Sequence, residues 1–234
     1  MHPVLAGLLS GRGGGLLCRG CLAGLGAGAE AGLCAACWEG LRPLPSLRCV
    51  RCALPHDEGA ECPEPSDWER GDALWDYHGG RPPLGALLVP GIKAGEGGWR
   101  RALLRRAAAT PWPAWTRDCQ GVVPVPTLRL KRLLRGFDLA EEWADQVADG
   151  LGLPRLDVLG KHWRASAQTG RPESQRRTLP RKAFRLKGAP GMEGKTLLLV
   201  DDVWTTGTTL LRCAQALRKG GAAEIRVLTL FRAL

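Results

Sequence analysis

One stretch near the end of the chain constrains its fold more than any other, and it reads Leu-Leu-Leu-Val-Asp-Asp-Val-Trp-Thr-Thr-Gly-Thr-Thr over residues 197–209. The apolar run from Leu197 to Val200 is typical of a strand that is buried on both faces of a parallel sheet. Two carboxylates and a loop of small residues follow, and a helical pattern of apolar residues begins at Leu210. The stretch therefore predicts a strand, a turn and a helix of an α/β fold.

The turn after this strand offers groups that suit a sugar phosphate. The first N–H groups of a helix have no partner within the helix, and together with the helix dipole they favour an anion. Asp201 and Asp202 repel a phosphate, but they can accept hydrogen bonds from vicinal hydroxyls or share a Mg²⁺ ion with the ligand. A phosphate beside a diol describes a ribose 5-phosphate. The alternative is an ordinary turn capped by one Asp or Thr, which needs fewer of these residues.

The same stretch resembles the loop that binds 5-phosphoribosyl 1-pyrophosphate (PRPP) in type I phosphoribosyltransferases. The resemblance rests on both acidic residues, on the Thr-Thr-Gly-Thr core and on the order of strand, loop and helix. It implies that Asp201 and Asp202 hold the ribose hydroxyls, that Mg²⁺ binds together with PRPP, and that the loop wraps the 5-phosphate. The loop residues are Thr205, Thr206, Gly207, Thr208 and Thr209.

Seven of the nine cysteines precede residue 63, and most of them form Cys-x-x-Cys pairs. Cys18, Cys21, Cys34 and Cys37 make a complete set of four zinc ligands, because the two-residue spacing lets both thiolates of a pair face one tetrahedral ion. Disulfides are the alternative, and the lack of a secretion signal disfavours them.

A second set of cysteines is incomplete. Cys49, Cys52 and Cys62 supply three thiols, and Pro65 stands where a fourth cysteine would finish the pattern. His56 offers a nitrogen, but a histidine four residues after Cys52 does not match the usual spacing of ligands within a zinc knuckle. Two interpretations stay open for this set, which are a second zinc site and a former zinc site that has lost its metal but still packs in the fold.

The charge of the chain points to an anionic partner. The formal net charge is +10, which suits nucleic acid as well as a ligand rich in phosphate. No run of eighteen apolar residues is present, so we expect no membrane insertion. The start of the chain lacks the pattern of a signal peptide, which predicts a cytoplasmic protein. The sequence does not indicate an oligomeric state.

Strand-like and helix-like segments alternate after residue 69, which predicts an α/β domain with a parallel sheet. We expect a small Cys-rich zinc-ribbon domain with its linker over residues 1–68, and a phosphoribosyltransferase-like domain over residues 69–234. Strands are expected near 73–77, 121–126, 156–159, 197–200 and 224–231, and helices near 82–93, 99–109 and 138–151 and after 210.

The order of motifs along the chain resembles the ComF family of competence proteins. Cysteine knuckles are followed by Val-Pro-Val-Pro at 123–126, Arg-Gly-Phe-Asp at 135–138, Ala-Phe at 183–184 and then the acidic pair. The resemblance implies a zinc ribbon joined to a phosphoribosyltransferase-like domain. It also implies a role in natural transformation, in which single-stranded DNA is taken up by bacteria, together with other competence proteins.

The chain departs from the ComF pattern at several positions. Asp138 and Leu179 stand where the family usually has Asn, and Trp204 occupies a position where a small apolar residue is common. None of these departures touches the phosphate loop.

The first functional hypothesis is a transferase that uses PRPP. Basic residues after the strand at 121–126 would neutralise the leaving pyrophosphate, while the two aspartates fix the ribose ring. The sequence names neither an acceptor substrate nor a general base or other catalytic residue. The expected pyrophosphate-binding residues are Arg129, Lys131, Arg132 and Arg135.

The second hypothesis is a non-catalytic module on the same fold that binds single-stranded DNA. Its bases would stack on Trp163 or Trp204, beside a basic segment that is otherwise a solvated loop. The basic residues of this segment are Arg164, Arg171, Arg176, Arg177, Arg181, Lys182 and Arg185.

Overall fold

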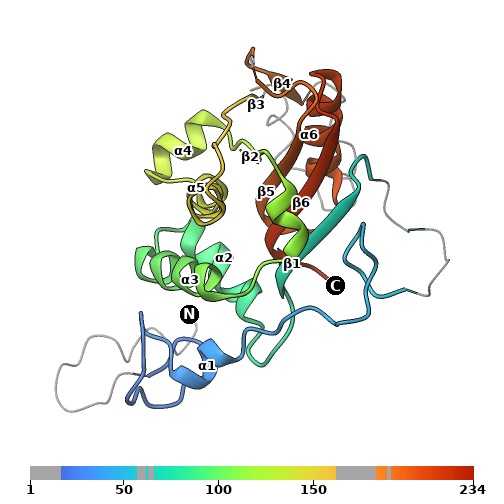
Figure 1. Ribbon diagram of the computed structural model, residues 1–234. Helices are drawn as coiled ribbons and strands as arrows, with labels where there is room; N and C mark the ends of the chain where they lie inside the picture. Colours follow the sequence, from blue (N-terminus) through green and yellow to red (C-terminus); the bar gives the residue numbers. More distant parts are fainter. Residues whose placement is uncertain (1–16, 57–61, 63–65, 162–182, 189–190) are drawn as a thin grey trace.

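A four-stranded parallel sheet in the order β1-β6-β5-β2 forms the centre of the computed structural model, which describes residues 17–56, 62, 66–161, 183–188 and 191–234 (Figure 1). Every neighbouring pair of strands in this sheet is parallel, so the predicted α/β fold with a parallel sheet is confirmed. The strands are β1 (Arg70–Asp76), β2 (Gly121–Pro124), β5 (Thr196–Trp204) and β6 (Glu224–Arg232).

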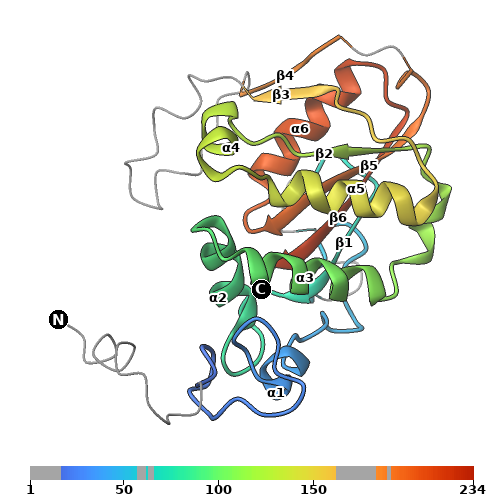
Figure 2. The same cartoon turned by 90° about the vertical axis from the view of Figure 1, so that its left-hand side faces the viewer.

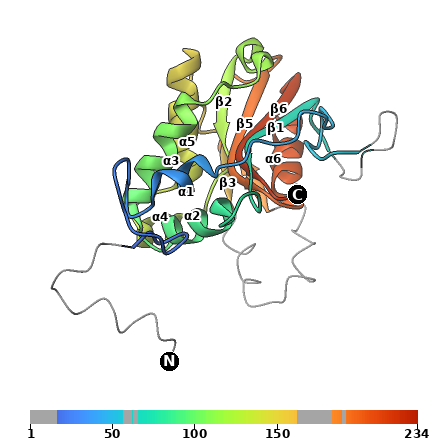
Figure 3. The same ribbon diagram turned by 90° about the horizontal axis from the view of Figure 1, so that it is seen from below.

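Helices cover both faces of the sheet. α2 (Leu84–Lys93), α3 (Gly97–Ala109) and α5 (Leu139–Leu151) pack on one face, and α6 (Thr208–Lys219) packs on the other (Figures 1 and 3). Successive side chains of a strand point to opposite faces. Leu198 and Val200 therefore enter the core beneath α2, α3 and α5, while Leu197 and Leu199 enter the core beneath α6.

The ends of α5 show how the local sequence sets a helix boundary. The side chain of Asp138 accepts a hydrogen bond of 3.1 Å from the Ala140 backbone N–H, which caps the start of the helix. Gly152 ends the helix in the left-handed conformation, with φ of 66°. Asp and Asn are about equally good caps, so either residue at position 138 can start this helix.

The strand that we expected near residues 156–159 is not part of the parallel sheet. Arg155 makes one isolated parallel bridge with Val122, and the chain then leaves the sheet edge. The next strand, β3 (Leu159–Lys161), pairs antiparallel with β4 (Phe184–Leu186) in a separate two-stranded sheet. The apolar residues of this segment are therefore buried as predicted, but the expectation that they belong to the parallel sheet is wrong. Leu159 and Phe184 instead join the core beneath α6.

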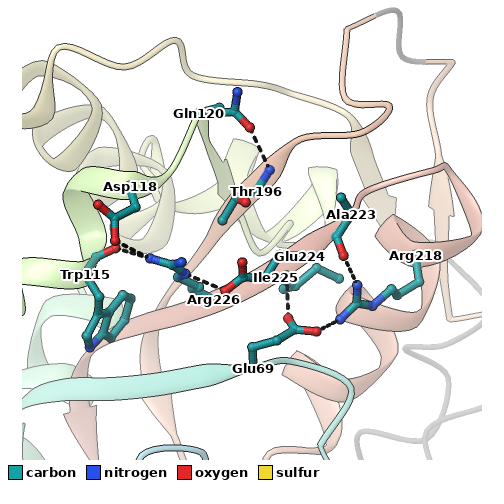
Figure 4. Close-up of polar contacts among 10 residues, drawn as sticks. All are labelled: Glu69, Trp115, Asp118, Gln120, Thr196, Arg218, Ala223, Glu224, Ile225 and Arg226. Carbon is teal, nitrogen blue, oxygen red and sulfur yellow. Dashed lines mark hydrogen bonds and ion pairs between the residues drawn. The ribbon is translucent and has the colours of Figure 1, made fainter.

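Ion pairs and hydrogen bonds lock the amino ends of the strands together (Figure 4). Glu69 accepts a hydrogen bond of 2.8 Å from the Ile225 N–H and pairs with Arg218 of α6. Arg226 pairs with Glu224 at 2.7 Å and with Asp118 at 3.1 Å. The polar groups of this edge thus bind one another, whereas the carboxyl ends of the strands carry the groups described below.

The Cys-rich residues 17–56 run along α3, α2 and the outer edge of β1 (Figure 2). Pro43 forms an isolated bridge with Trp75, and Arg48 donates hydrogen bonds of 3.0 and 2.7 Å to the carboxylate of Asp72. None of the described helices combines the length and the apolar character that a bilayer crossing requires. The remaining elements are α1 (Ala35–Glu39), η2 (Ala114–Asp118) and α4 (Arg129–Arg135).

Candidate functional site

The predicted acidic pair lies at the carboxyl end of β5. The strand continues to Trp204, so Asp201 and Asp202 belong to the strand itself rather than to the loop after it. Asp202 is buried, and its backbone N–H donates a hydrogen bond of 2.8 Å to the carboxylate of Asp201. Ligands of open α/β sheets bind beyond the carboxyl ends of the strands, which is where these two carboxylates lie.

The predicted phosphate loop leads directly into α6. Gly207 holds the position before the helix with φ of 66°, a left-handed conformation that glycine adopts without strain. Thr205 and Thr206 are exposed, and the hydroxyl of Thr206 lies 3.0 Å from that of Thr208. No side chain caps α6, so its first backbone N–H groups remain suited to an anion.

Lys93 is a member of this site that sequence reasoning missed. It is the last residue of α2, and its Nζ lies 2.6 Å from Oδ2 of Asp202. Burial lowers the pKa of Lys93, but the charge and hydrogen bond of Asp202 outweigh burial, so its pKa is raised overall. Lys93 is the only charged residue of an otherwise apolar helix, and this is the feature of the sequence that could have marked it as a site residue.

The charges around β5 do not balance. Burial, and then the neighbouring charge of Asp202, raise the pKa of Asp201 well above its ordinary value. The charges of Lys93 and Lys161 offset only part of this effect, so Asp201 remains costly to ionise beside Asp202. A divalent cation or a pair of hydroxyl donors would relieve this imbalance.

The predicted pyrophosphate residues lie on α4, which follows β2. Arg135 is near enough to lower the pKa of Lys93 by its charge, so the structure brings it toward the acidic pair. Arg132 instead donates a hydrogen bond of 2.9 Å to Glu141 of α5. The side chains of Arg129 and Lys131 lie outside the described part of the structure.

The first cysteine group has the geometry of a zinc site. The Sγ atoms of Cys18, Cys21, Cys34 and Cys37 all lie within 4.8 Å of one another. Burial raises the pKa of Cys18, but backbone hydrogen bonds from Cys21, Cys34 and Gly20 lower it to about 6. A thiolate is the form that binds metal, so this donor set suits a tetrahedral Zn²⁺ ion.

The second cysteine group gains a fourth ligand that the sequence prediction did not include. His56 joins Cys49, Cys52 and Cys62, and the four ligand atoms lie within 4.8 Å of one another. The sequence prediction listed only three candidate ligands for this group, and the structure adds His56 as the fourth. The backbone turns back at Ala53, whose φ is 57°, so the short Cys52–His56 spacing does close on one point. Three thiols and one imidazole are a donor set that zinc takes in structural sites.

The prediction that DNA bases stack on Trp204 is wrong. Trp204 is only 1% exposed, because its ring packs against Trp68 and Arg232. Trp163 and most of the basic residues predicted to contact DNA lie among residues 162–182, outside the described residues, whereas Arg185 is an exposed residue of β4.

Comparison with known proteins places these features in context. Residues 138–234 match the phosphoribosyl transferase domain family. The chain is 30% identical over 220 residues to "DNA utilization protein YhgH" of Salmonella typhi, covering 87% of this chain and 91% of that protein. It is 33% identical over 116 residues to "Competence protein F" of Haemophilus influenzae, covering 49% of this chain and 51% of that protein. Among solved structures, glutamine PRPP amidotransferase from B. subtilis is 25% identical with a TM-score of 0.38, covering 56% of this chain and 26% of that chain.

We predict that His56 is a metal ligand. The purified protein should hold about two zinc ions per chain, and His56→Ala should lower this to about one, because removal of one ligand opens the tetrahedral site. Elemental analysis after gel filtration measures the ratio. His78→Ala is the control, since His78 is exposed and belongs to neither group. Two zinc ions in the His56→Ala protein would contradict the prediction.

We also predict that Mg²⁺ can replace the charge of Lys93. Lys93→Met leaves Asp202 without its ammonium partner and should lower the free energy of unfolding by about 1–2 kcal/mol, after allowance for partial exposure. Millimolar Mg²⁺ should raise the melting temperature of this variant more than that of the wild type. Lys219→Met, at the exposed end of α6, should show neither effect. Equal stabilisation of all three proteins by Mg²⁺ would count against the site.

Proposed function

The chain belongs to the ComF/YhgH family of competence and DNA utilization proteins, and we propose that it binds PRPP together with Mg²⁺ at the carboxyl end of β5. One observation carries the proposal. The acidic pair near the carboxyl end of β5 contacts the ammonium of Lys93 from the end of α2, and the uncapped start of α6 follows a few residues later in the chain. This combination matches the three parts of the ligand, which are a diol, a pyrophosphate and a 5-phosphate.

The ribose and its 5-phosphate would bind through complementary groups. The 2- and 3-hydroxyls would donate hydrogen bonds to the carboxylates of Asp201 and Asp202. The 5-phosphate would accept hydrogen bonds from the first N–H groups of α6 and from the hydroxyls of the threonine loop. Gly207 lets the backbone come close to the phosphate, because it brings no side chain.

The pyrophosphate would lie on the side of the site where the positive charges are. Lys93 and Arg135 supply these charges, and Mg²⁺ would supply more when it is bound with the ligand. In a transfer reaction the bond between C1 of the ribose and the pyrophosphate oxygen breaks, and the electron pair leaves with the pyrophosphate. An acceptor then forms the new bond to C1. The residues of the site would act by positioning and by neutralising charge, so binding and turnover are separate experimental questions.

A second function, the binding of single-stranded DNA, is favoured by the charge of the chain. The net charge of +10 exceeds what one sugar phosphate requires. Relatives of the chain carry the names competence protein and DNA utilization protein. We propose that DNA binding and PRPP binding use different surfaces, because the carboxyl end of β5 is occupied by acidic side chains that repel a phosphate backbone.

The PRPP site predicts separable defects. Asp201→Asn and Asp202→Asn should each weaken the binding of PRPP with Mg²⁺ roughly tenfold to a hundredfold, because a charge-assisted hydrogen bond contributes about 1.5–3 kcal/mol. The raised pKa of Asp201 means that it takes up a proton at a higher pH than an ordinary carboxyl, so affinity should weaken as the pH falls, and less so in Asp201→Asn. Isothermal titration calorimetry measures both effects.

Two matched variants sharpen this test. Gly207→Val forces a branched side chain into a left-handed conformation and should weaken ribose 5-phosphate as well as PRPP. Gly194→Val imposes the same kind of strain at φ of 69° but outside the loop, and it should leave both affinities unchanged. Asp118→Asn is the control for the acidic pair, since Asp118 lies at the amino end of the sheet. Folded wild-type protein that gives no heat with millimolar PRPP and Mg²⁺ would refute the proposed function.

DNA binding should depend steeply on salt. Replacing Arg176, Arg177, Arg181 and Lys182 together by Gln should reduce the slope of log affinity against log salt by about three, because each phosphate contact on a single strand contributes about 0.7. Fluorescence anisotropy with a labelled oligonucleotide measures the slope. Arg101→Gln with Arg117→Gln, two exposed positions, is the control. An unchanged slope in the fourfold variant would place the DNA surface elsewhere.

A further inference from the structure

The second cysteine group contacts the phosphoribosyltransferase fold through three consecutive backbone carbonyls. Val50 O accepts a hydrogen bond of 2.8 Å from the Gly71 N–H. Arg51 O accepts one of 2.7 Å from Trp68 Nε1, and Cys52 O accepts one of 3.0 Å from Arg232 Nε. Every residue of the knuckle between Cys49 and Cys52 after its first cysteine is therefore hydrogen-bonded to β1, to Trp68 just before β1, or to β6.

Arg232 connects this knuckle to the phosphate loop. Arg232 is only 1% exposed, and its guanidinium donates hydrogen bonds to Cys52 O and to the carbonyls of Trp204, at 3.0 Å, and of Thr205. Thr205 is the first residue of the predicted phosphate loop. One buried side chain thus bridges a metal ligand and the loop, because guanidinium donors point in several fixed directions at once.

The ring of Trp204 packs closely around this bridge. The Trp204 ring lies with its centroid 4.7 Å from the Arg232 guanidinium carbon and 5.4 Å from the Trp68 ring. A Cβ on Gly71 would come within 2.6 Å of Arg51 O and 2.8 Å of the Trp204 ring, so only glycine allows the knuckle and the ring to approach so closely. Movement of the knuckle must therefore move Trp204 or break these hydrogen bonds.

The first cysteine group has no such connection among the described contacts. It docks on α3, where Trp99 Nε1 donates a hydrogen bond of 2.8 Å to Ala31 O and Arg106 pairs with Glu30. Cys18 and Cys37 share the core cluster of α2 and α3, whereas Cys52 shares the cluster that holds Trp68 and Trp204. The two groups thus support different parts of the fold.

We propose that the metal bound by Cys49, Cys52, His56 and Cys62 positions the phosphate loop through Arg232. The metal fixes the knuckle, the knuckle carbonyl of Cys52 orients the guanidinium, and the guanidinium holds the carbonyls of Trp204 and Thr205. Loss of this metal releases the loop, while loss of the metal at Cys18, Cys21, Cys34 and Cys37 does not. The inference rests on the proposed function in one respect, which is that Thr205–Thr209 bind a phosphate.

The test compares Cys62→Ser with Cys21→Ser in the full chain. Cys62 lies outside the knuckle, so its replacement changes none of the residues that supply the three carbonyls. Each variant should keep about one zinc ion by elemental analysis. Hydrogen exchange of the Thr205–Gly207 amides, followed by mass spectrometry, should quicken roughly tenfold in Cys62→Ser only, and ribose 5-phosphate affinity should fall by a similar factor. Equal exchange rates in the two variants, each with one zinc ion lost, would overturn the proposal.

Arg232→Lys provides an independent test if Cys62→Ser does not fold. A lysine keeps the charge but cannot donate to Cys52 O and to the loop carbonyls together, so this variant should retain both zinc ions and still show faster exchange in the loop. Unchanged exchange in Arg232→Lys would also overturn the proposal. If the wild type binds neither ribose 5-phosphate nor PRPP with Mg²⁺, the proposed function fails, yet the difference in exchange between the variants still decides the coupling.

Discussion

Burial of β5 on both faces determines where polar chemistry can lie in this fold. Leu197, Leu198, Leu199 and Val200 are fully buried, so the strand has no room for a polar side chain until it approaches its carboxyl end. Asp201 and Asp202 stand at that point, still partly enclosed by the sheet, and burial makes their charge costly. The cost is offset by the Lys93 ammonium and would be offset further by a cation or hydroxyl donors. The same low-dielectric surroundings that make ionisation of the carboxylates costly would strengthen their hydrogen bonds to a ligand.

The two cysteine groups support the site from different directions. The first group packs on Trp99 and Ala102 of α3, within the core that also holds α2, the helix that ends in Lys93. The second group holds Arg232 and, through it, the start of the phosphate loop. The two candidate metal groups, which precede the phosphoribosyltransferase fold in the sequence, thus contact different parts of that fold.

The parts of the candidate site that are contiguous in the chain could be proposed from the sequence alone. Asp201, Asp202 and the loop to Thr209 could be read directly, because strand, acids and helix start follow one another within thirteen residues. Lys93 and Arg232 could not be read, since tertiary folding brings them from other elements to the end of β5. His56 was visible but undervalued, because its short spacing from Cys52 closes only with Ala53 in a left-handed turn. Trp204 was misjudged as a stacking surface, since nothing local reveals that Trp68 and Arg232 cover it.

The buried guanidinium of Arg232 joins separate segments of the chain, although burying a charged group costs desolvation free energy. An apolar residue of similar volume at position 232 would fill the space without desolvating a charge. It would, however, leave the carbonyls of Cys52 and Thr205 without this donor, whereas the Trp204 carbonyl would keep its hydrogen bond from the Ala233 N–H. A buried carbonyl left unpaired costs about 1–3 kcal/mol. Arginine is the side chain that satisfies several carbonyls at fixed angles. The three carbonyls belong to the Cys49–Cys52 knuckle, to the end of β5 and to the predicted phosphate loop, so the hydrogen bonds of Arg232 join these three segments.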